Sequence, residues 1–269
     1  MIKVGIVGCG TIGAELAQAC QTRFRDEVQL TALADLDASR ARRLQRRVRP
    51  RPDILEPDEL IKKCDLVIEA ASAQAAYEIA RKALSQGKDV MVMSVGGLIG
   101  REKEVFRLAK THRCCLYLPS GGVVGLDGLK AAGIGKIQRV TLTTRKPPQG
   151  FMDAPYVLRR RIRLQHLKQE KLLFEGSAAR AVKGFPKNIN VSATLSLAGL
   201  GAKRTRVRII ANPLMLLNVH ELYVQGDFGS FYTRTENFPA PHNPKTSQLA
   251  ILSAVATLDR ILRNVKIGT

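Results

Sequence analysis

Acidic residues are scarce in this chain: its 269 residues include 23 Asp and Glu against 43 Lys and Arg, a formal net charge of +20. Long apolar runs are also missing, and no stretch approaches the roughly 20 apolar residues that a membrane-spanning helix needs. The chain opens with Met1-Ile2-Lys3 and has no charged leader followed by an apolar segment and a cleavage site, the pattern of a secretory signal. We therefore expect no membrane span and a cytoplasmic location.

Cysteine is scarce as well. The five thiols are an odd number without CxxC spacing, which argues against a disulfide framework and against a zinc site. We expect reduced, mostly structural thiols and no bound metal. Disorder is not expected, because 45% hydrophobic and 25% charged residues lie near the globular average. A chain of this length forms one large or two modest domains, and we expect two.

The positive charge is concentrated in three short windows. Residues 36–51 contain seven Arg and one Asp, residues 145–171 contain eight basic and two acidic residues, and residues 203–208 add four basic residues. Clustered Lys and Arg are the electrostatic footprint of phosphate binding, so composition alone raises nucleic acid as a partner. Where each basic window lies in the fold indicates whether it binds a nucleic acid or a small anion.

The first 119 residues alternate between short apolar runs and helical patterns. Strands are predicted over 2–7, 28–34, 66–69, 90–93 and 115–118, and helices over 12–23, 38–47, 73–86 and 101–112. Continuous apolar runs are typical of strands buried on both faces, and β-α alternation is typical of a parallel sheet. We predict an α/β fold in which residues 1–119 form a Rossmann-type, doubly wound parallel sheet.

The pattern changes after Pro119. A strand is predicted over 137–144 and a helix over 190–199, followed by three strand candidates over 204–211, 216–225 and 230–235. Strands that follow one another favour antiparallel pairing, so we predict a second, α+β domain with a mixed sheet over residues 120–243. Apolar residues at helical spacing from 246 to 265 predict a terminal helix, within 244–269, that packs back onto the first domain.

A G-x-G-x-x-G motif follows the first predicted strand directly and opens a helix. Its first glycine permits a tight turn, the second lets the backbone approach a pyrophosphate, and the third lets helix and strand pack closely. The helix N-terminus then offers amide donors to phosphates. A glycine-rich turn without a ligand is the alternative, but the strand and helix around the motif favour a dinucleotide site made by Gly8, Gly10, Thr11, Ile12 and Gly13.

Asp35 ends the second predicted strand, 22 residues after Gly13. A carboxylate there accepts hydrogen bonds from an adenosine ribose, which favours NAD. Arg40, Arg42 and Arg43 follow on the next helix and could pair with the 2′-phosphate of NADP, unless they form a solvated helix face. We predict that both NAD and NADP are accepted.

Small residues lie at the ends of later strands in the first half. Ala71 and Ser72 follow the strand over 66–69, Ser94 follows the next, and Gly122 and Val124 lie in the glycine-rich segment after Pro119. In an open α/β sheet, ligands bind outside the carboxyl ends of the strands, so small residues there leave room for ribose and nicotinamide. Turn chemistry explains any one of these segments equally well.

Polar residues in the second half are candidates for substrate contacts. Asn188 or Asn190 would cap the helix over 190–199, and Lys187 beside that N-terminus suits an anionic substrate. His220 shares a strand face with Asn218 in an otherwise apolar stripe. Such a polar pair needs a partner or a purpose, so His220 is either a satisfied core histidine or a catalytic one.

The residues gathered so far resemble the L-aspartate dehydrogenase family over essentially the whole chain. The likeness rests on the glycine motif and on the segments 68–72, 93–96, 119–127, 184–191, 218–221 and 243–247. The resemblance implies a fold like that of dihydrodipicolinate reductase and homoserine dehydrogenase. It further implies that His220 is the catalytic histidine and that Asn190 contacts the cofactor. Gly122 stands where the family usually has Ala, which makes the cofactor contact at Gly122 and Val124 a backbone one.

The resemblance implies NAD(P)-dependent oxidation of L-aspartate to iminoaspartate, which hydrolyses to oxaloacetate and ammonia, in the service of NAD biosynthesis and in a homodimer. His220 would accept a proton from the substrate or activate water. The two substrate carboxylates need cationic or amide donors, for which Lys187, Asn188, Lys245, Thr246 and Ser247 are candidates.

Two other functions compete with this one. Another amino-acid or semialdehyde oxidoreductase would share the architecture, but the histidine-rich substrate motif of dihydrodipicolinate reductase is not visible. A nucleotide-sensing DNA-binding regulator would use the basic surface, but no helix-turn-helix stands out. The largest basic window follows Asp35, beside the expected adenosine site, so we expect the charge to steer anionic small molecules and expect no nucleic acid partner.

Overall fold

The computed structural model describes residues 1–186, 189–241 and 243–268, with backbone only at 244 and 245. The chain divides into two compact units. Unit 1 comprises Met1–Pro119 and Ile251–Val265, and unit 2 comprises Ser120–Ala250 and the last residues of the chain. Among the described residues, no helix is long and apolar enough to cross a membrane.

Unit 1 contains one parallel sheet with the strand order β3-β2-β1-β4-β5-β6. Its strands are short and mostly apolar: β1 (Ile2–Val7), β2 (Val28–Ala34), β3 (Asp53–Ile54), β4 (Leu66–Glu69), β5 (Asp89–Val92) and β6 (Leu116–Tyr117). All neighbouring pairs are parallel. The order reverses between β1 and β4, which is the switch point where a doubly wound sheet binds its ligand.

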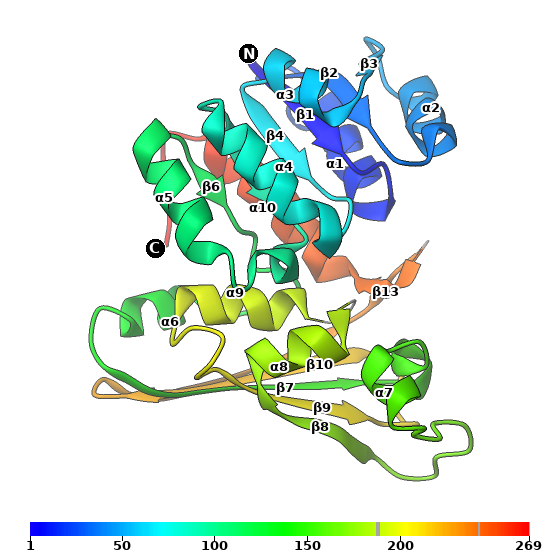
Figure 1. Cartoon of the computed structure of the whole chain (residues 1–269), viewed down its shortest axis with the longest axis vertical. Helices are drawn as coiled ribbons and strands as arrows, with labels where there is room; N and C mark the ends of the chain where they lie inside the picture. Colours follow the sequence, from blue (N-terminus) through cyan, green and yellow to red (C-terminus); the bar gives the residue numbers. More distant parts are fainter. Residues whose placement is uncertain (187–188, 242, 269) are drawn as a thin grey trace. The chain divides into compact units, whose positions relative to one another are not determined.

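Helices cover both faces of this sheet (Figure 1). They are α1 (Thr11–Thr22), α2 (Ala38–Arg47), α3 (Pro57–Lys63), α4 (Ala73–Ser85), α5 (Glu102–His112), the short 3-10 helix η1 (Val95–Leu98) and the last helix, α10 (Gln248–Leu262). One core contains residues of α1, α2 and α10, and the second contains residues of α3, α4 and α5. Ala254 and Leu258 of α10 are fully buried in the first core.

Unit 2 contains a mixed sheet with the strand order β11-β10-β7-β9-β8. Its strands are β7 (Ile137–Lys146), β8 (Lys171–Ser177), β9 (Arg206–Ala211), β10 (Asn218–Gly226) and β11 (Gly229–Asn237). A small ladder of β12 (Pro239–Ala240) and β13 (Asn243–Ser247) follows. The Rossmann-type first sheet and the mixed second sheet confirm the predicted fold class.

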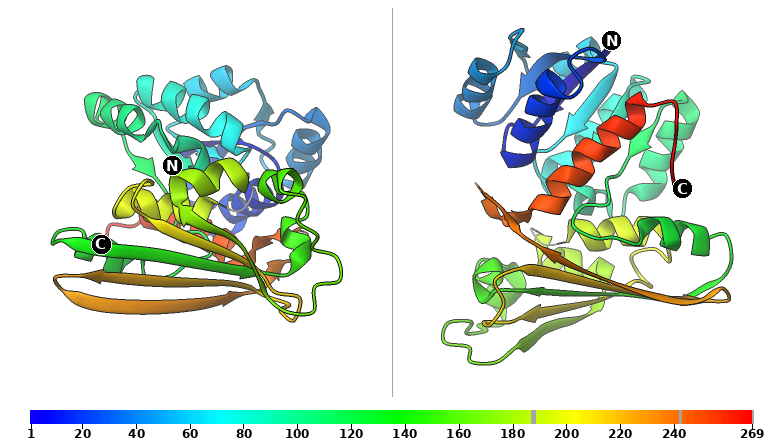
Figure 2. Two further views of the ribbon diagram at one scale, coloured as in Figure 1. Left: turned by 60° about the horizontal axis from the view of Figure 1, so that its bottom comes forward. Right: turned by 180° about the vertical axis from the view of Figure 1, so that it is seen from behind.

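Helices of unit 2 gather on one face of its sheet. They are α6 (Leu126–Ala132), α7 (Pro155–Arg159), α8 (Ala178–Gly184), α9 (Asn190–Ala198) and the 3-10 helix η2 (Pro148–Phe151). Figure 2 shows α6, α8 and α9 over this face, while the opposite face carries no helix among the described residues. Two apolar cores fill the covered face, one under α8 and one under α6 and α9.

The pairing of unit 2 differs from the sequence-based prediction in three places. Only β10 and β11 form the antiparallel neighbours expected from consecutive strands, because β9 inserts beside β7 in parallel. Strand β8 was not predicted, and it completes the edge of the sheet beside β9. The last helix begins at Gln248 rather than at 246, since residues 243–247 pair with β12 instead.

Candidate active site

The turn between β1 and α1 requires glycine at two positions. Gly8 has a φ of +103°, and a Cβ atom there would lie 2.4 Å from the backbone of Ala70. A Cβ atom at Gly13 would lie 1.9 Å from the carbonyl oxygen of Gly8, which brings helix α1 close to the strand. Gly10 precedes α1, and its added Cβ would meet nothing within 4 Å. The open space at Gly10, before the amides of Thr11 and Ile12, has the form of a pyrophosphate cradle.

Asp35 follows β2 and is held by two backbone amides. Cys9 N donates to one carboxylate oxygen at 2.7 Å and Asp37 N donates to the other at 2.8 Å. Each oxygen keeps a lone pair for a further donor, so the carboxylate is fixed in position and can still accept ribose hydroxyls.

Glu69, at the end of β4, is fully buried and organises the ends of two strands. Its carboxylate accepts from Ala71 N at 2.8 Å, from Ser72 N at 3.1 Å and from Ser94 N at 3.0 Å. Burial raises the pKa of Glu69. The sequence analysis gave this residue no role, although an acid that ends an apolar strand is a visible signal. Ser72 itself caps α4 by accepting from Ala75 N at 3.4 Å.

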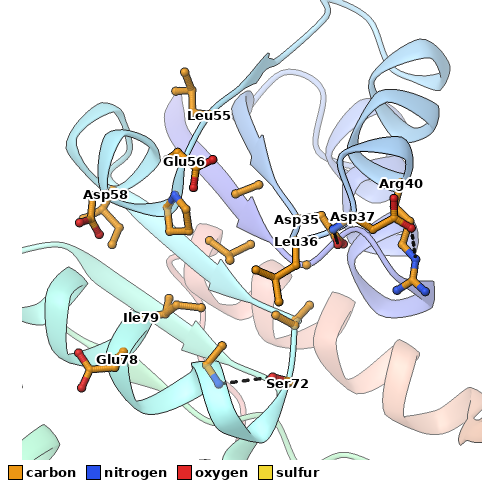
Figure 3. Close-up of a pocket in the computed structure, with 18 of the residues that line it drawn as sticks. Asp35, Leu36, Asp37, Arg40, Leu55, Glu56, Asp58, Ser72, Glu78 and Ile79 are labelled. Atoms are coloured by element: carbon orange, nitrogen blue, oxygen red, sulfur yellow. Dashed lines mark hydrogen bonds and ion pairs between the residues drawn. The ribbon is translucent and has the colours of Figure 1, made fainter.

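A cavity of about 600 Å³ opens at this edge of the unit 1 sheet (Figure 3). Gly8, Gly10, Asp35, Ala71 and Ser72 line it, so the structure brings these predicted cofactor residues together.

Of the three arginines considered for a 2′-phosphate, Arg40 lines this cavity, whereas Arg42 and Arg43 are not among its lining residues. Arg40 is paired with Asp37 at 3.3 Å, as Figure 3 shows. Arg42 and Arg43 are exposed on α2.

His220 lies on β10 within unit 2, with 4% of its surface exposed. Its Nδ1 atom is 3.0 Å from the hydroxyl of Thr144 on the neighbouring strand β7. Burial, and secondarily the positive charge of Lys146, lowers the pKa of His220 to about 3. The ring is therefore neutral at physiological pH, and its Nε2 atom is the one directed away from the Thr144 contact.

Polar groups from three segments surround His220. The carbonyl oxygen of Gly122 accepts from Thr235 Oγ1 at 3.1 Å and from Asn237 Nδ2 at 2.9 Å. A Cβ atom at Gly122 would lie 2.7 Å from Ser247 Oγ and 3.5 Å from His220 Cδ2, so this backbone passes directly beside the ring. Gly122, Ser247 and His220 are distant in sequence and adjacent in unit 2.

A buried lysine, Lys146, ends β7 two residues after Thr144, with 7% of its surface exposed. Side chains two residues apart on a strand share a face, so Lys146 lies on the His220 face of the sheet. Burial lowers the pKa of Lys146 to about 8. The sequence analysis counted Lys146 only as part of a basic window, because nothing local marks one lysine among eight as buried.

Other predicted site residues are exposed or lie outside the residues that the structure describes. Lys187 and Asn188 lie outside the described residues, as does the side chain of Lys245. Asn190 is exposed and is the first residue of α9, where Ile189 rather than an asparagine occupies the N-cap position. Val124 is 43% exposed.

Thr246 and Ser247 lie in β13 rather than within a helix. Ser247 Oγ accepts from Ala250 N at 3.3 Å and so caps α10. Among the described residues, no three His, Cys, Asp or Glu side chains are arranged to hold a metal ion.

The comparisons with known proteins agree with this geometry. Residues 8–119 match a model described as the NAD-binding domain of homoserine dehydrogenase, and residues 127–261 match the C-terminal domain of aspartate dehydrogenase. The chain is 51% identical to the L-aspartate dehydrogenase of Methanosarcina acetivorans, with 100% of both chains covered. It is 42% identical to that of Methanothermobacter thermautotrophicus, covering 100% of this chain and 99% of the relative.

The chain belongs to the L-aspartate dehydrogenase family. This membership confirms the resemblance predicted from the sequence, and with it an oxidoreductase that uses a pyridine nucleotide and a small-molecule substrate.

Solved structures share the fold. The aspartate dehydrogenase of Thermotoga maritima superposes with a TM-score of 0.78 at 24% identity, covering 100% of both chains. A homoserine dehydrogenase from Thiobacillus denitrificans superposes with a TM-score of 0.61 at 14% identity, covering 97% of this chain and 73% of that one.

Proposed function

We propose that this enzyme oxidises L-aspartate to iminoaspartate, which is released as oxaloacetate and ammonia or passed on for NAD biosynthesis. The observation that carries the proposal is His220, buried, neutral and surrounded by polar groups, in a chain 51% identical to an L-aspartate dehydrogenase over its full length.

The cofactor in this proposal is NAD or NADP. The amides of Gly10, Thr11 and Ile12 at the α1 N-terminus would hold the pyrophosphate, and Asp35 would accept from the adenosine ribose. Arg40 would meet the 2′-phosphate of NADP, since it lines the cavity beside Asp35. Gly8 and Gly13 shape the turn, and Ala71, Ser72, Gly122, Val124 and Asn190 are the further proposed contacts.

The substrate chemistry assigns a proton transfer to His220. Bound nicotinamide supplies the acceptor for the hydride that leaves the substrate Cα. With Nδ1 protonated, His220 donates to Thr144, and the Nε2 lone pair accepts a proton from the substrate ammonium as the C=N bond forms. Two substrate carboxylates bring negative charge that stabilises the imidazolium, which offsets the low pKa of the buried ring. Lys187, Asn188, Lys245, Thr246 and Ser247 remain proposed carboxylate contacts.

Spectrophotometry of cofactor reduction with a panel of amino acids tests the function. We expect reduction with L-aspartate in the presence of NAD and of NADP, and little with homoserine, alanine or glutamate. Preference for another amino acid would favour a different dehydrogenase of the same architecture, for which the homoserine dehydrogenase match over residues 8–119 is the supporting observation.

A homodimer and a cytoplasmic location complete the proposal. The helix-free face of the unit 2 sheet presents Tyr223 and Tyr232, with the ion pairs of Glu221 to Arg145 and Arg234, and Tyr is enriched at protein interfaces. Sedimentation velocity tests the dimer, and a charge at Tyr232 is expected to weaken it. The five free thiols suit the reducing cytoplasm.

A further inference from the structure

Lys146 is the buried charge in unit 2 that the proposed chemistry has not yet used. A lysine is almost never fully buried without a purpose, because removing an ammonium group from water is costly. Lys146 is buried to 7% exposure at the end of β7, on the sheet face that carries His220. Its burial beside His220 sets it apart from the exposed lysines of the chain.

The strand register places Lys146 at the same polar end of the sheet as His220. Thr144 of β7 pairs with His220 of β10, and Arg145 pairs with Val219. Continued by one residue, this register sets Lys146 beside Asn218, which is also buried and pairs with Asn237 of β11. Lys146 and His220 are therefore diagonal neighbours on adjacent strands, within reach of one small ligand.

A cavity of about 400 Å³ lies next to Lys146 within unit 2. Its lining includes Asn218, Gly150 and Pro147. A Cβ atom at Gly150 would lie 3.5 Å from both the Cβ and the Cδ atoms of Lys146, so the stem of the lysine packs against the wall of this cavity. The cavity and the stem of Lys146 therefore share Gly150 as a neighbour.

Lys146 and His220 are the buried titratable side chains that the described sheet strands place at this polar end, while Lys171 of β8, level with Lys146 through Ala211 of β9, is exposed. Arg145 and Glu221 alternate onto the opposite face, where they pair with each other. The packed segments η2 and α9 carry no titratable side chain, and Arg180 and Lys183 of α8 are exposed. The charge on Lys146 lowers the pKa of His220, and the two groups form a coupled pair.

We propose that the ammonium group of Lys146, diagonal to His220 on the neighbouring strand, binds a carboxylate of the dicarboxylate substrate. The substrate's negative charge then neutralises the influence of Lys146 on His220, so proton acceptance by His220 is coupled to occupation of the site. Lys146 keeps its own proton throughout. The inference rests on the proposed function and adds the residue that selects an anionic substrate.

Succinate tests the carboxylate contact, because it has two carboxylates and no amino group that could titrate above pH 7. Calorimetric titration of the full-length enzyme with succinate, with saturating cofactor, compares the wild type with Lys146→Met, Lys146→Arg and the control Lys171→Met on the exposed start of β8. We expect succinate affinity to fall at least tenfold in Lys146→Met, less in Lys146→Arg, and to stay unchanged in the control.

The pH dependence of succinate binding shows whether Lys146 acts through its charge or only through its packing. Burial sets the pKa of Lys146 to about 8, so the ammonium is lost as the pH rises through that value. Succinate binding to the wild type should weaken above about pH 8, and this weakening should disappear in Lys146→Arg, whose guanidinium stays charged. In Lys146→Met, the pKa of His220 rises, so the acid limb of kcat/KM for aspartate should move to higher pH.

Each of these measurements either supports or overturns the contact between Lys146 and a substrate carboxylate. Unchanged succinate affinity in a folded Lys146→Met variant, or the same alkaline weakening in Lys146→Arg, would overturn the inference. If Lys146→Met does not fold, as thermal melting would show, the comparison of Lys146→Arg with the wild type still decides. Absence of aspartate-dependent cofactor reduction in the wild type would instead sink the proposed function, independently of Lys146.

Discussion

His220 differs from an exposed histidine in the protonation state that it holds. An exposed imidazole titrates near pH 6.5, whereas burial and Lys146 lower the pKa of His220 to about 3. No sequence pattern predicts this shift in pKa, because burial and a charge on another strand are tertiary effects. With this pKa the neutral ring is a weak base by itself, so its ability to accept a proton depends on the negative charge that binds beside it.

Replacing His220 with Ala is expected to lower kcat by about 10²- to 10⁴-fold, the usual contribution of a positioned acid-base group. Cofactor affinity, measured by quenching or enhancement of reduced-cofactor fluorescence, should hardly change, because the pyrophosphate cradle belongs to unit 1. Thr144→Val keeps the imidazole and removes its Nδ1 partner, so it should give a smaller loss. Near-normal turnover in His220→Ala would refute the catalytic assignment.

Arg40 offers a second prediction at the same scale. Its guanidinium lines the cavity beside Asp35, and a charged hydrogen bond to a 2′-phosphate contributes about 1.5–3 kcal/mol. Arg40→Ala should therefore weaken NADP binding by about ten- to a hundredfold and leave NAD binding nearly unchanged. Arg43→Ala, on the solvated face of the same helix, is the matched control. Equal losses for both cofactors would contradict the assignment.

At the scale of helices and strands, the turn from β1 into α1 contains two glycines that are needed for different reasons. Gly13 lets helix and strand approach, since its added Cβ would lie 1.9 Å from Gly8 O, whereas Gly10 borders open space. The first position is fixed by packing within the protein. Packing within the protein does not require glycine at position 10, so the missing side chain of Gly10 matters only when a pyrophosphate is bound.

Gly10→Ala should therefore fold normally and bind either cofactor at least tenfold more weakly, because the new methyl group occupies the path of the phosphates. Gly13→Ala should lower the melting temperature, because its methyl group displaces α1 from β1. Thermal melting and cofactor titration of both variants check the pair. Tight cofactor binding by Gly10→Ala would place the pyrophosphate elsewhere.

Sequence patterns predicted most elements of unit 1, although not β3 or α3, and those of unit 2 only in part. Continuous apolar strands such as β1 and β4 carry a strong local signal, and their bounds are as predicted. The parallel insertion of β9 beside β7 carries no local signal, because partner choice depends on how distant segments pack. The glycine motif of the cofactor site is recognisable from sequence because its spacing is local, and Glu69 at the end of an apolar strand offers a weaker local signal. Lys146 stands out from the other lysines only by its burial, which no local pattern predicts.

On the scale of the whole molecule, the charge of +20 acts as a long-range attractor for anions. Both the cofactor and aspartate are anionic, and exposed charges are screened beyond about 8 Å at physiological ionic strength. We expect kcat/KM for aspartate, and the cofactor association rate in stopped flow, to fall as salt rises from roughly 0.02 to 0.5 M. Reversing the charges of the exposed Arg42 and Arg46 should flatten this dependence for the cofactor. Salt-independent rates would show that steering plays no part.

The packing of α10 has a consequence for the order in which the protein matures. Ala254 and Leu258 are fully buried in the same core as α1 and β1, although some 240 residues separate them along the chain. During synthesis, the amino-terminal sheet emerges first, yet one of its faces stays incomplete until the last helix leaves the ribosome. The cofactor-binding unit is therefore completed only after residues 120–250 of unit 2 have been synthesised, and a chain that ends before α10 would expose an apolar face of the unit 1 sheet.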